Sequence, residues 1–406
     1  MTQPRRLLPN MTHSITRRVA RRCLALKPNP QINQIFLYAM GRAQQRRRVQ
    51  VHAAVTNSSH HHTVATDRRE GAPEPLGLSP EERETSDLDL FLGHFHGLTA
   101  RAFNTHYGRG ENFWRSGSYD NCELWNAAAQ LKQCLYAWTN PVKDGLIDHP
   151  DEWEGVMTLP EDFGTRIPIS KPKGAFFGGR RPASHRVPRD LDALARMERE
   201  FAAAEAEALA RGKARDETKQ RKRSKRKNKT PRGKKRQRVV DRDRRRRVGK
   251  LIGPQPVLPA EESKSSLPDL VYLEITPPPA WQHLPIEEVR AFFRAELERE
   301  VAEIHAERER EGKRTMSSQA LQDQHPFEAS GPTRPTFQRN PRVCCPGDWE
   351  LRLEVLRGLQ AFRSSYRESW RRRHKRGTVF PAGTTLMRRL HKARVAPGTG
   401  PPLRAA

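Results

Sequence analysis

The sequence predicts an α+β fold, an antiparallel sheet with flanking helices, in residues 1–155. Two observations support this prediction. Residues 49–55 alternate apolar with polar side chains, which is the period of a half-buried strand, whereas residues 30–43 and 88–102 place apolar side chains at helical intervals. Because helices alternate with short strands, we expect the strands to form one sheet against which the helices pack.

The first elements are a strand, a helix and a hairpin. Residues 12–19 are predicted as a strand, and Pro30 is expected to open a helix because proline suits the first helical position. Residues 49–55 and 60–65 are predicted as the two strands of a hairpin, with residues 57–59 as its turn.

Two further helices are predicted before residue 141. Ser86 is the expected N-cap of a helix that runs to Ala102. Residues 107–114 are expected to form a turn and a short strand. A helix is then expected over residues 122–138, and Pro141 is expected to end it because proline disfavours helical geometry in the residue before it.

Composition changes in the second half of the chain. Residues 150–188 are rich in Gly, Pro and turns, and residues 191–210 predict an Ala/Glu-rich helix. Residues 211–250 are a basic low-complexity block that we expect to be unstructured when unbound. Further on, the periodicity predicts a strand at 270–276, a helix at 285–309 and a long helix from Asp348 to Trp370.

These patterns predict four regions. Residues 1–155 form the α+β domain, and residues 156–260 form a Gly/Pro-rich and then basic, disordered linker. Residues 261–390 form a strand and a mostly helical C-terminal extension, and residues 391–406 form a disordered tail.

Charge indicates a polyanionic partner. The chain has 406 residues, with Lys+Arg 75 against Asp+Glu 47 and a formal net charge of +28. Residues 211–250 hold 22 Lys+Arg against 4 Asp+Glu, so this block contributes most of the excess. Nucleic acid is the simplest polyanion that such a chain binds.

Other compositional features limit the location of the protein. No apolar run reaches the roughly 18 residues of a membrane span, so no membrane partner is expected. The 5 cysteines show no CxxC spacing, which indicates reduced intracellular thiols. The basic N-terminus lacks the apolar segment of a secretory signal, although its acid-free arginines leave a mitochondrial presequence open.

Two short motifs indicate chemistry. In a strand, His60 and His62 project from the same face, and in a helix Tyr136 and Asn140 project from the same side. Two imidazoles and an amide oxygen can hold one divalent cation, and a nearby tyrosine can attack a phosphodiester. The alternatives are a solvated histidine run in a loop and a boundary tyrosine whose hydroxyl faces water.

The remaining tyrosines are weaker candidates for a nucleophile. Tyr38 and Tyr366 lie on or near apolar stripes, where packing is the expected role, and Tyr107 and Tyr119 fall in turns. Tyr136 lies beside the stripe of its helix, on the flank that it shares with Lys132 and Asn140, where it can face a site.

Four ordered blocks together resemble a known family. NQIFLY at 33–38, HAAVTNSSHHH at 52–62, GRGENFW at 108–114 and YAWTNPV at 136–142 are similar to blocks of the REP-associated tyrosine transposases, the bacterial single-tyrosine HUH transposases. The resemblance covers about residues 5–153. It extends to segments 271–276, 340–343 and 380–384, as in longer members of the family.

The resemblance implies a fold, a site and an activity. The implied fold is a ferredoxin-like antiparallel sheet flanked by helices, with Tyr136 as the nucleophile and His60, His62 and Asn140 as ligands of Mg²⁺ or Mn²⁺. Members of the family cleave single-stranded DNA beside palindromic hairpins, leaving a 5′-phosphotyrosine link and a free 3′-OH. A bacterial cytoplasmic, nucleoid-associated protein, monomeric or homodimeric, is implied.

Two positions depart from the family pattern. Ser59 stands where the family commonly has Asn, and His61 stands where a bulky apolar residue is usual. Both departures concern the packing of the hairpin and the affinity for a metal ion, and neither removes a ligand.

The sequence therefore supports three functions. The first is a metal-dependent nuclease and strand transferase acting on single-stranded or hairpin DNA, and the second is a host-adopted, catalytically weak DNA-binding protein of the same fold. The third is an RNA-binding or ribosome-associated protein. The basic block is then either a linker that holds nucleic acid non-specifically or a clamp on a hairpin. The other cations expected to bind DNA are Lys132, Lys143, Arg115, Arg371 and Arg372.

Overall fold

The computed structural model describes residues 4–67, 86–116, 119–174, 176–177, 267–316, 318–329, 342–375 and 377–398. The helix expected at 191–210, the basic block at 211–250 and residues 399–406 of the tail lie outside the described residues.

Among the described residues, seven strands form one mixed sheet in the order β5-β6-β2-β3-β1-β4-β7. The strands are β1 (Thr12–Arg18), β2 (Val49–Asn57), β3 (His60–Asp67), β4 (Asp120–Leu124), β5 (Thr165–Ser170), β6 (Leu270–Ile275) and β7 (Val343–Cys344). The central strands β2-β3-β1-β4 are antiparallel, but β6 runs parallel to β2 and β7 runs parallel to β4. The antiparallel sheet predicted for residues 1–155 is therefore present in β1 to β4, but the complete sheet is mixed, because strands from distant parts of the chain join it.

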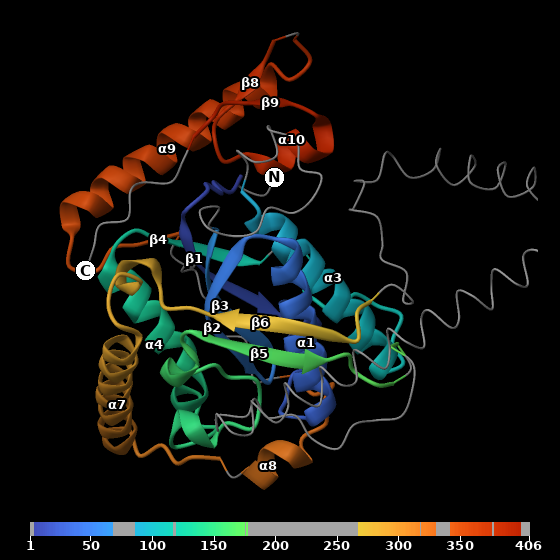
Figure 1. Cartoon of the computed structure of the whole chain (residues 1–406), viewed down its shortest axis with the longest axis vertical. Helices are drawn as coiled ribbons and strands as arrows, with labels where there is room; N and C mark the ends of the chain where they lie inside the picture. Colours follow the sequence, from blue (N-terminus) through green and yellow to red (C-terminus); the bar gives the residue numbers. More distant parts are fainter. Residues whose placement is uncertain are drawn as a thin grey trace, which may run out of the picture. The chain divides into compact units, whose positions relative to one another are not determined.

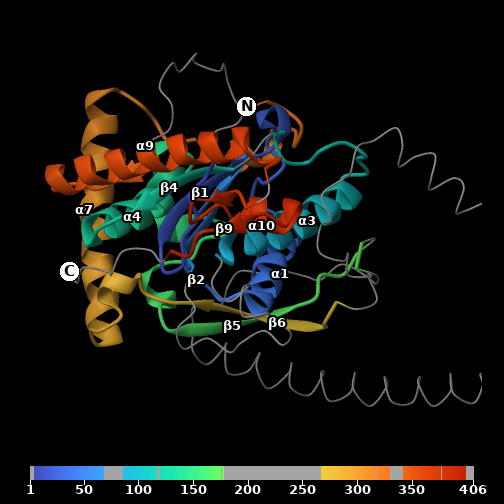
Figure 2. The same cartoon turned by 90° about the horizontal axis from the view of Figure 1, so that it is seen from above.

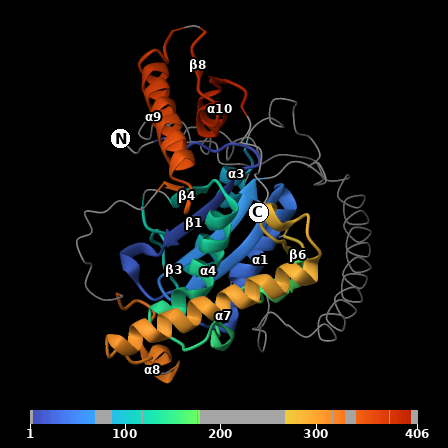
Figure 3. The ribbon, with the colours of Figure 1, turned by 90° about the vertical axis from the view of Figure 1, so that its left-hand side faces the viewer.

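Helices cover both faces of the sheet (Figures 1 and 3). Helices α1 (Pro30–Arg46) and α3 (Leu88–His106) lie on one face, where the rings of Phe36 and Phe95 meet with centroids 4.9 Å apart. Helices α4 (Ala127–Lys143) and α7 (Ile286–Arg310) lie on the other, where Trp138 and Phe293 are 6.1 Å apart. Short 3-10 turns occupy Ala20–Arg22, Pro150–Glu152, Pro160–Asp162 and Pro279–Trp281. No described helix has the length and apolar character to cross a membrane.

The predicted N-terminal elements are confirmed, with small shifts at their ends. Strand β1, helix α1 and the hairpin of β2 and β3 occur where the sequence indicates them. The turn is shorter than expected, since β2 continues through Asn57 and only Ser58 and Ser59 connect the strands. Helix α3 begins at Leu88 with Asp87 and not the predicted Ser86 as its N-cap, although the Leu88 N–H donates to the Ser86 hydroxyl at 3.2 Å.

The predicted helix over residues 122–138 is wrong at both ends. Its first residues belong to strand β4, and α4 starts only after Asn126, whose side chain accepts a hydrogen bond from the Ala129 N–H. At the other end α4 continues through Pro141 to Lys143. In the last turn a proline removes only one backbone donor, and the N–H of Asp144 still donates to the Asn140 carbonyl at 3.0 Å.

Two other local predictions need correction. Residues 107–114 form no described strand, and Trp114 makes only an isolated bridge with Val19. Conversely, β5 lies within residues 156–260, which the sequence predicted as a linker. Pro168 interrupts the β5 strand pattern, but proline is tolerated there because β5 is the edge strand beside β6 (Figure 2).

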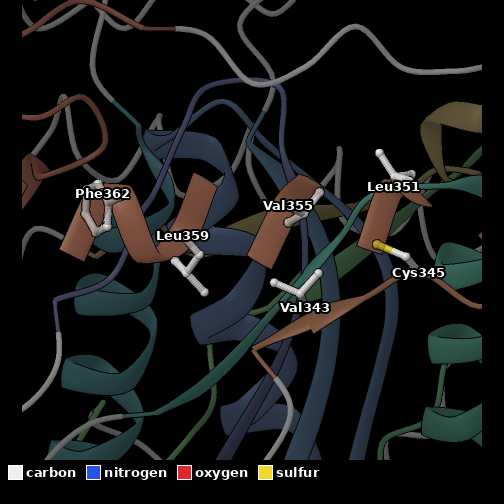
Figure 4. Close-up of a cluster of buried hydrophobic side chains, with 6 residues drawn as sticks. All are labelled: Val343, Cys345, Leu351, Val355, Leu359 and Phe362. Carbon is white, nitrogen blue, oxygen red and sulfur yellow. The ribbon is translucent and has the colours of Figure 1, made fainter. Parts of the chain in front are cut away.

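The C-terminal part is mostly helical, as predicted. It contains α8 (Ser318–Asp323), α9 (Trp349–Arg371) and α10 (Thr385–His391), with a small parallel sheet of β8 (Val379–Phe380) and β9 (Arg394–Val395). Helix α9 and strand β7 share a buried apolar cluster (Figure 4), whose members are Val343, Cys345, Leu351, Val355, Leu359 and Phe362. The N-terminal segment also contacts this part, since the Leu7 N–H donates to the Gly383 carbonyl at 3.0 Å.

Candidate nuclease site on the α4 face of the sheet

Two rows of side chains cross three adjacent strands on the face that α4 covers. In the first row Asn57 pairs with His60, and His60 pairs with Arg18. In the second row Val55 pairs with His62, and His62 pairs with Thr16. Directly paired residues of antiparallel strands project from the same face. The prediction that His60 and His62 lie on strand β3 with one orientation is therefore confirmed.

The two imidazoles lie next to each other and are largely removed from water. Their ring centroids are 4.8 Å apart, and His62 is buried. Nδ1 of His62 and Oγ1 of Thr16 are hydrogen-bonded at 2.9 Å. Nε2 of His62 is buried and has no hydrogen-bond partner in the described part of the chain. A buried polar atom in this state needs an explanation, and a metal ion is a partner that suits a neutral imidazole nitrogen.

Helix α4 brings Tyr136 and Asn140 over the imidazoles. The rings of Tyr136 and His62 meet edge to face with centroids 5.2 Å apart. Tyr136 is 40% exposed, so solvent or a ligand reaches it, whereas Asn140 one turn later is only 6% exposed. The four-residue spacing in a helix thus places a reachable phenol and a shielded amide on the same side.

Asn57 connects the sheet to the end of α4. Its Nδ2 donates to Oδ1 of Asn140 and, at 2.9 Å, to Oδ2 of Asp144. The bond to Asn140 fixes the orientation of that amide, since its oxygen must face the donor. Asn57 is itself 1% exposed, and this burial holds the contact in place.

The two histidines are neutral at physiological pH. Burial, followed by the charges of Arg18 and other groups, lowers the pKa of His60 to about 4. Burial and the neighbouring imidazoles lower the pKa of His62 well below its usual value. The Asn140 side chain raises the pKa of both rings, but by less than burial lowers it. Neutral imidazoles keep a nitrogen lone pair, which metal ligation requires.

Tyr136 is held in its protonated form. Burial raises its pKa, and the Asp144 carboxylate raises it further, whereas Arg18 and Asn140 lower it. Burial likewise raises the pKa of Asp144, against the influence of Arg18 and Asn57. The phenol therefore needs a proton acceptor before it can attack a phosphate. The Asp144 carboxylate, which interacts electrostatically with Tyr136, lies at the C-terminal end of the same helix.

The donor set fits a divalent cation. Neutral nitrogens of His60 and His62 and an oxygen of Asn140 or Asp144 are the ligand types that Mn²⁺ and Mg²⁺ accept. The unpartnered Nε2 of His62 supports this fit. The described residues contain no group of three or more His, Cys, Asp and Glu that could hold a metal ion, so the Asn140 amide is needed to complete the predicted set.

The predicted DNA-binding cations divide into two groups. Lys143 lies against the Tyr136 ring at 5.5 Å from its centroid and pairs with Glu300 of α7 at 2.7 Å. The exposed Arg115 acts electrostatically on Arg18, so it also lies near the site. Lys132 is exposed on α4, but it acts on Cys344 at the β7 edge. Arg371 and Arg372 lie at the C-terminal end of α9, and no described contact joins them to these site residues.

Sequence reasoning missed four side chains of the site: Thr16, Arg18, Asn57 and Asp144. The register of β1 against β3 brings Thr16 and Arg18 to the site, and the pairing of β2 with β3 in the hairpin brings Asn57 there. The only signal in the sequence was alternation, which places Thr16 and Arg18 on one face of their strand. Asp144 gave no signal, because the helix was expected to end before it.

Two other tyrosines take structural roles. The Tyr107 hydroxyl donates to the Ala25 carbonyl at 2.8 Å, and burial raises its pKa. Tyr119 is 9% exposed, with the Arg5 guanidinium 4.2 Å from its ring centroid. Neither contacts the imidazole pair in the described structure, whereas Tyr136 does.

Comparison with solved structures gives distant similarities, of which one is to a DNA-bound transposase. A solved structure of a REP-associated tyrosine transposase bound to a REP hairpin matches at 20% sequence identity, covering 40% of this chain and 85% of that chain, with a TM-score of 0.30. A similarity this low carries no argument about the function of this chain. No family model and no curated protein match the chain.

Proposed function

We propose that the chain is a metal-dependent enzyme that nicks and rejoins single-stranded DNA beside palindromic hairpins through a covalent bond to Tyr136. The observation that carries the proposal is the contact of a reachable Tyr136 with the neutral, adjacent pair His60 and His62. The element order β-α-β-β-α-β and the strand order β2-β3-β1-β4 also support it, since they describe the ferredoxin-like arrangement that the sequence resemblance implies.

In the proposed reaction the Tyr136 oxygen forms a bond to phosphorus while the bond from phosphorus to the 3′ oxygen breaks. Asp144 accepts the phenol proton, and the leaving 3′ oxygen takes up a proton to become a free 3′-OH. One phosphodiester replaces another, so the reverse step can join the DNA to a second 3′-OH without ATP. His60, His62 and Asn140 would hold Mn²⁺ or Mg²⁺, which when bound stabilises negative charge on the phosphate.

Arg18 and Lys143 flank the phenol in this proposal. Arg18 projects from the same sheet face as His60 and lowers the pKa of Tyr136, and Lys143 lies beside the Tyr136 ring. Both cations are suited to orient a phosphate for attack by the Tyr136 oxygen.

Labelled DNA tests the proposal. Purified protein is incubated with single-stranded hairpin DNA labelled at its 5′ or its 3′ end, with Mn²⁺, Mg²⁺ or EDTA, and resolved on a denaturing gel. We expect a metal-dependent covalent adduct that carries only the DNA 3′ of the nick, and no adduct with Tyr136→Phe. An adduct of equal yield in EDTA would contradict the metal-dependent mechanism.

A second candidate function is a host-adopted, catalytically weak DNA-binding protein of the same fold. The raised pKa of Tyr136 and the ion pair that holds Lys143 on Glu300 favour it, since both reduce the reactivity of the phenol. In the same gel this candidate predicts hairpin binding with no adduct under any condition.

A further inference from the structure

Positive charge outside the block at 211–250 is concentrated in one folded part of the chain. Residues 349–398, which we call the C-terminal basic lobe, contain 13 Lys+Arg against 3 Asp+Glu. The block and this lobe together account for the whole net charge of +28, so the remaining residues are neutral in sum. The sheet and its nearest helices therefore have no overall attraction for a polyanion.

The cations of the C-terminal basic lobe are available to a ligand. Helix α9 buries one face, including Val355 and Leu359, against β7 and its surroundings. Several cations of α9 are exposed, and Arg372 forms an ion pair with Glu368 at 2.9 Å, with both side chains 62% exposed. Such a surface pair is readily exchanged for a phosphate. The exposed cations along and just after α9 include Arg352, Arg367, Arg371, Arg372, Arg373 and Lys375.

Helix α7 shows that this arrangement is not a general property of long helices here. It contains 8 Asp+Glu against 5 Lys+Arg over a similar length. Its arginines pair with neighbouring acids: Arg294 contacts Glu161 at 2.5 Å, and Arg290 contacts Glu287 at 2.6 Å. The same residue type is therefore neutralised on α7 and exposed on α9.

The geometry of α9 suits a duplex. Its 23 residues span about 35 Å, which is close to one helical turn of double-stranded DNA. Arginines along that length can contact phosphates that a duplex holds at fixed positions within one turn, whereas a flexible single strand offers no fixed positions.

The aromatic residues at the C-terminal end of α9 do not form a platform for bases. Trp370 is stacked on Tyr366 with centroids 6.3 Å apart, and the Arg373 guanidinium lies 4.6 Å from its ring centroid. The ring is therefore occupied by protein groups and orients Arg373. The exposed Trp349 lies at the other end of α9. Proteins that bind single strands instead present free aromatic faces to successive bases.

We propose that the C-terminal basic lobe binds the double-stranded stem of the DNA hairpin, while the single-stranded flank enters the Tyr136 site. This inference rests on the proposed function and assigns the stem and the flank to different parts of the molecule. The lobe contributes affinity through phosphates, and it does not take part in the chemical step.

Salt dependence of binding tests the inference. The probes are a DNA hairpin with a stem of about 10 base pairs, roughly one turn of duplex, and single-stranded DNA of equal length. The test variant is Arg367→Gln/Arg371→Gln/Arg372→Gln. The matched control is Arg166→Gln/Arg299→Gln/Lys313→Gln, which removes the same charge from side chains that are 60%, 66% and 65% exposed elsewhere. Binding is measured in full-length proteins that also carry Tyr136→Phe, so that no covalent bond forms.

For the hairpin, we expect the test variant to reduce the slope of log affinity against log salt concentration by about 2.7. This is the change expected when three phosphate contacts are lost. The control variant should leave this slope nearly unchanged, and both variants should bind the single strand like the parent protein. Equal slopes for test and control on the hairpin would overturn the inference. An equal loss on hairpin and single strand, or a loss only on an RNA hairpin of the same sequence, would also overturn it.

The outcome is independent of the proposed chemistry. Adduct formation is measured on the hairpin with its single-stranded flank, at a DNA concentration that saturates every protein, in proteins that retain Tyr136, with and without the test substitutions. An unchanged adduct with weakened hairpin binding supports the inference. If no protein forms an adduct, the proposed function fails while the slopes still decide whether the lobe binds a stem.

Discussion

His60 and His62 project from one face of β3, and His61 projects from the other. The imidazoles on the two faces have different neighbours. On the α4 face, His62 meets the exposed Tyr136, and its Nε2 has no hydrogen-bond partner among the described residues. On the opposite face, His61 is fully buried among aromatic rings at 5.4 to 5.5 Å, and its Nε2 lies 2.9 Å from Nε2 of His96. The aromatic neighbours are Phe36, Phe95 and Trp114.

This difference explains how the chain tolerates a histidine where an apolar residue is usual in the resembling family. A buried imidazole without a hydrogen bond destabilises a core, and the His96 side chain of α3 supplies a partner. One ring donates and the other accepts, and burial keeps both neutral because it lowers the pKa of His61 to about 3 and that of His96 well below its usual value. The same residue type therefore packs in the core on one face and lies in the proposed metal site on the other.

The largest effect is expected from Tyr136→Phe. Removing the hydroxyl removes the nucleophile, so covalent attachment to DNA should fall to background, about 10⁴-fold or more. Hairpin binding should be unchanged, because the ring and its contact with His62 remain. Quantitative gels and a binding titration on the same preparation measure both. A substantial adduct in the variant would assign the nucleophile to another residue.

Neighbouring positions on β3 test the two faces directly. His62→Gln should lower the rate of adduct formation about 10²-fold or more while leaving thermal unfolding nearly unchanged, since a ligand is lost. His61→Gln should instead lower the free energy of unfolding by about 1–3 kcal/mol and leave the rate per folded molecule close to the parent value. Rates are compared with melting curves of each variant. Similar rate losses in both variants would break the proposed distinction between the faces.

Acid should lower the free energy of unfolding through the buried histidines on the face of the sheet that α1 and α3 cover. Burial lowers the pKa of His13 and of His61 to about 3, below the unfolded value of 6.5. The unfolded state therefore binds more protons between about pH 6.5 and pH 3, and stability is lost as pH falls through this window. Each imidazole should contribute a loss of about 2–3 kcal/mol by pH 4.5. Denaturant unfolding at several pH values measures it.

His13→Leu provides the control for the pH effect. His13 is on the same face as His61, because it pairs with Ala65 across β1 and β3. The variant should show a shallower loss of stability with acid than the parent. An identical pH profile would show that His13 does not carry the effect.

The smallest effect is expected from Asn57→Ala. Asn57 touches neither DNA nor metal in the proposed mechanism, but it orients the Asn140 amide. Its loss should weaken Mn²⁺ binding about tenfold, as found for groups that orient metal ligands. Titration calorimetry with Mn²⁺ measures the affinity, and Asn57→Leu, which removes the donor at similar volume without adding charge, should behave like Asn57→Ala. Parent-like Mn²⁺ affinity in both variants would remove Asn57 from the site.

Local periodicity was sufficient to predict how the four candidate side chains are grouped. Alternation along β3 placed His60 and His62 on one face, and helical spacing paired Tyr136 with Asn140. Arg18 and Asn57 could not be predicted in the same way, because their place depends on the register between strands, which is a tertiary property.

Errors in the predicted elements have a similar origin. The short strand β4 contains Leu124, which also fits the apolar stripe expected for the following helix at Ala128 and Leu131. The pairing of β4 with β1 and β7 decides in favour of a strand. Strand β5 was missed because Pro168 argues against a strand, and its acceptance depends on an edge position that the sequence does not reveal.

The most direct test of the central claim is to identify the residue that carries the DNA. The adduct is digested with nuclease and trypsin, and the peptides are sequenced by mass spectrometry. We predict a nucleotide on the peptide of residues 133–143, attached at Tyr136, its only tyrosine. A nucleotide on the peptide that contains Tyr107 or on the one that contains Tyr119 would contradict the claim that the α4 face of the sheet is the catalytic site.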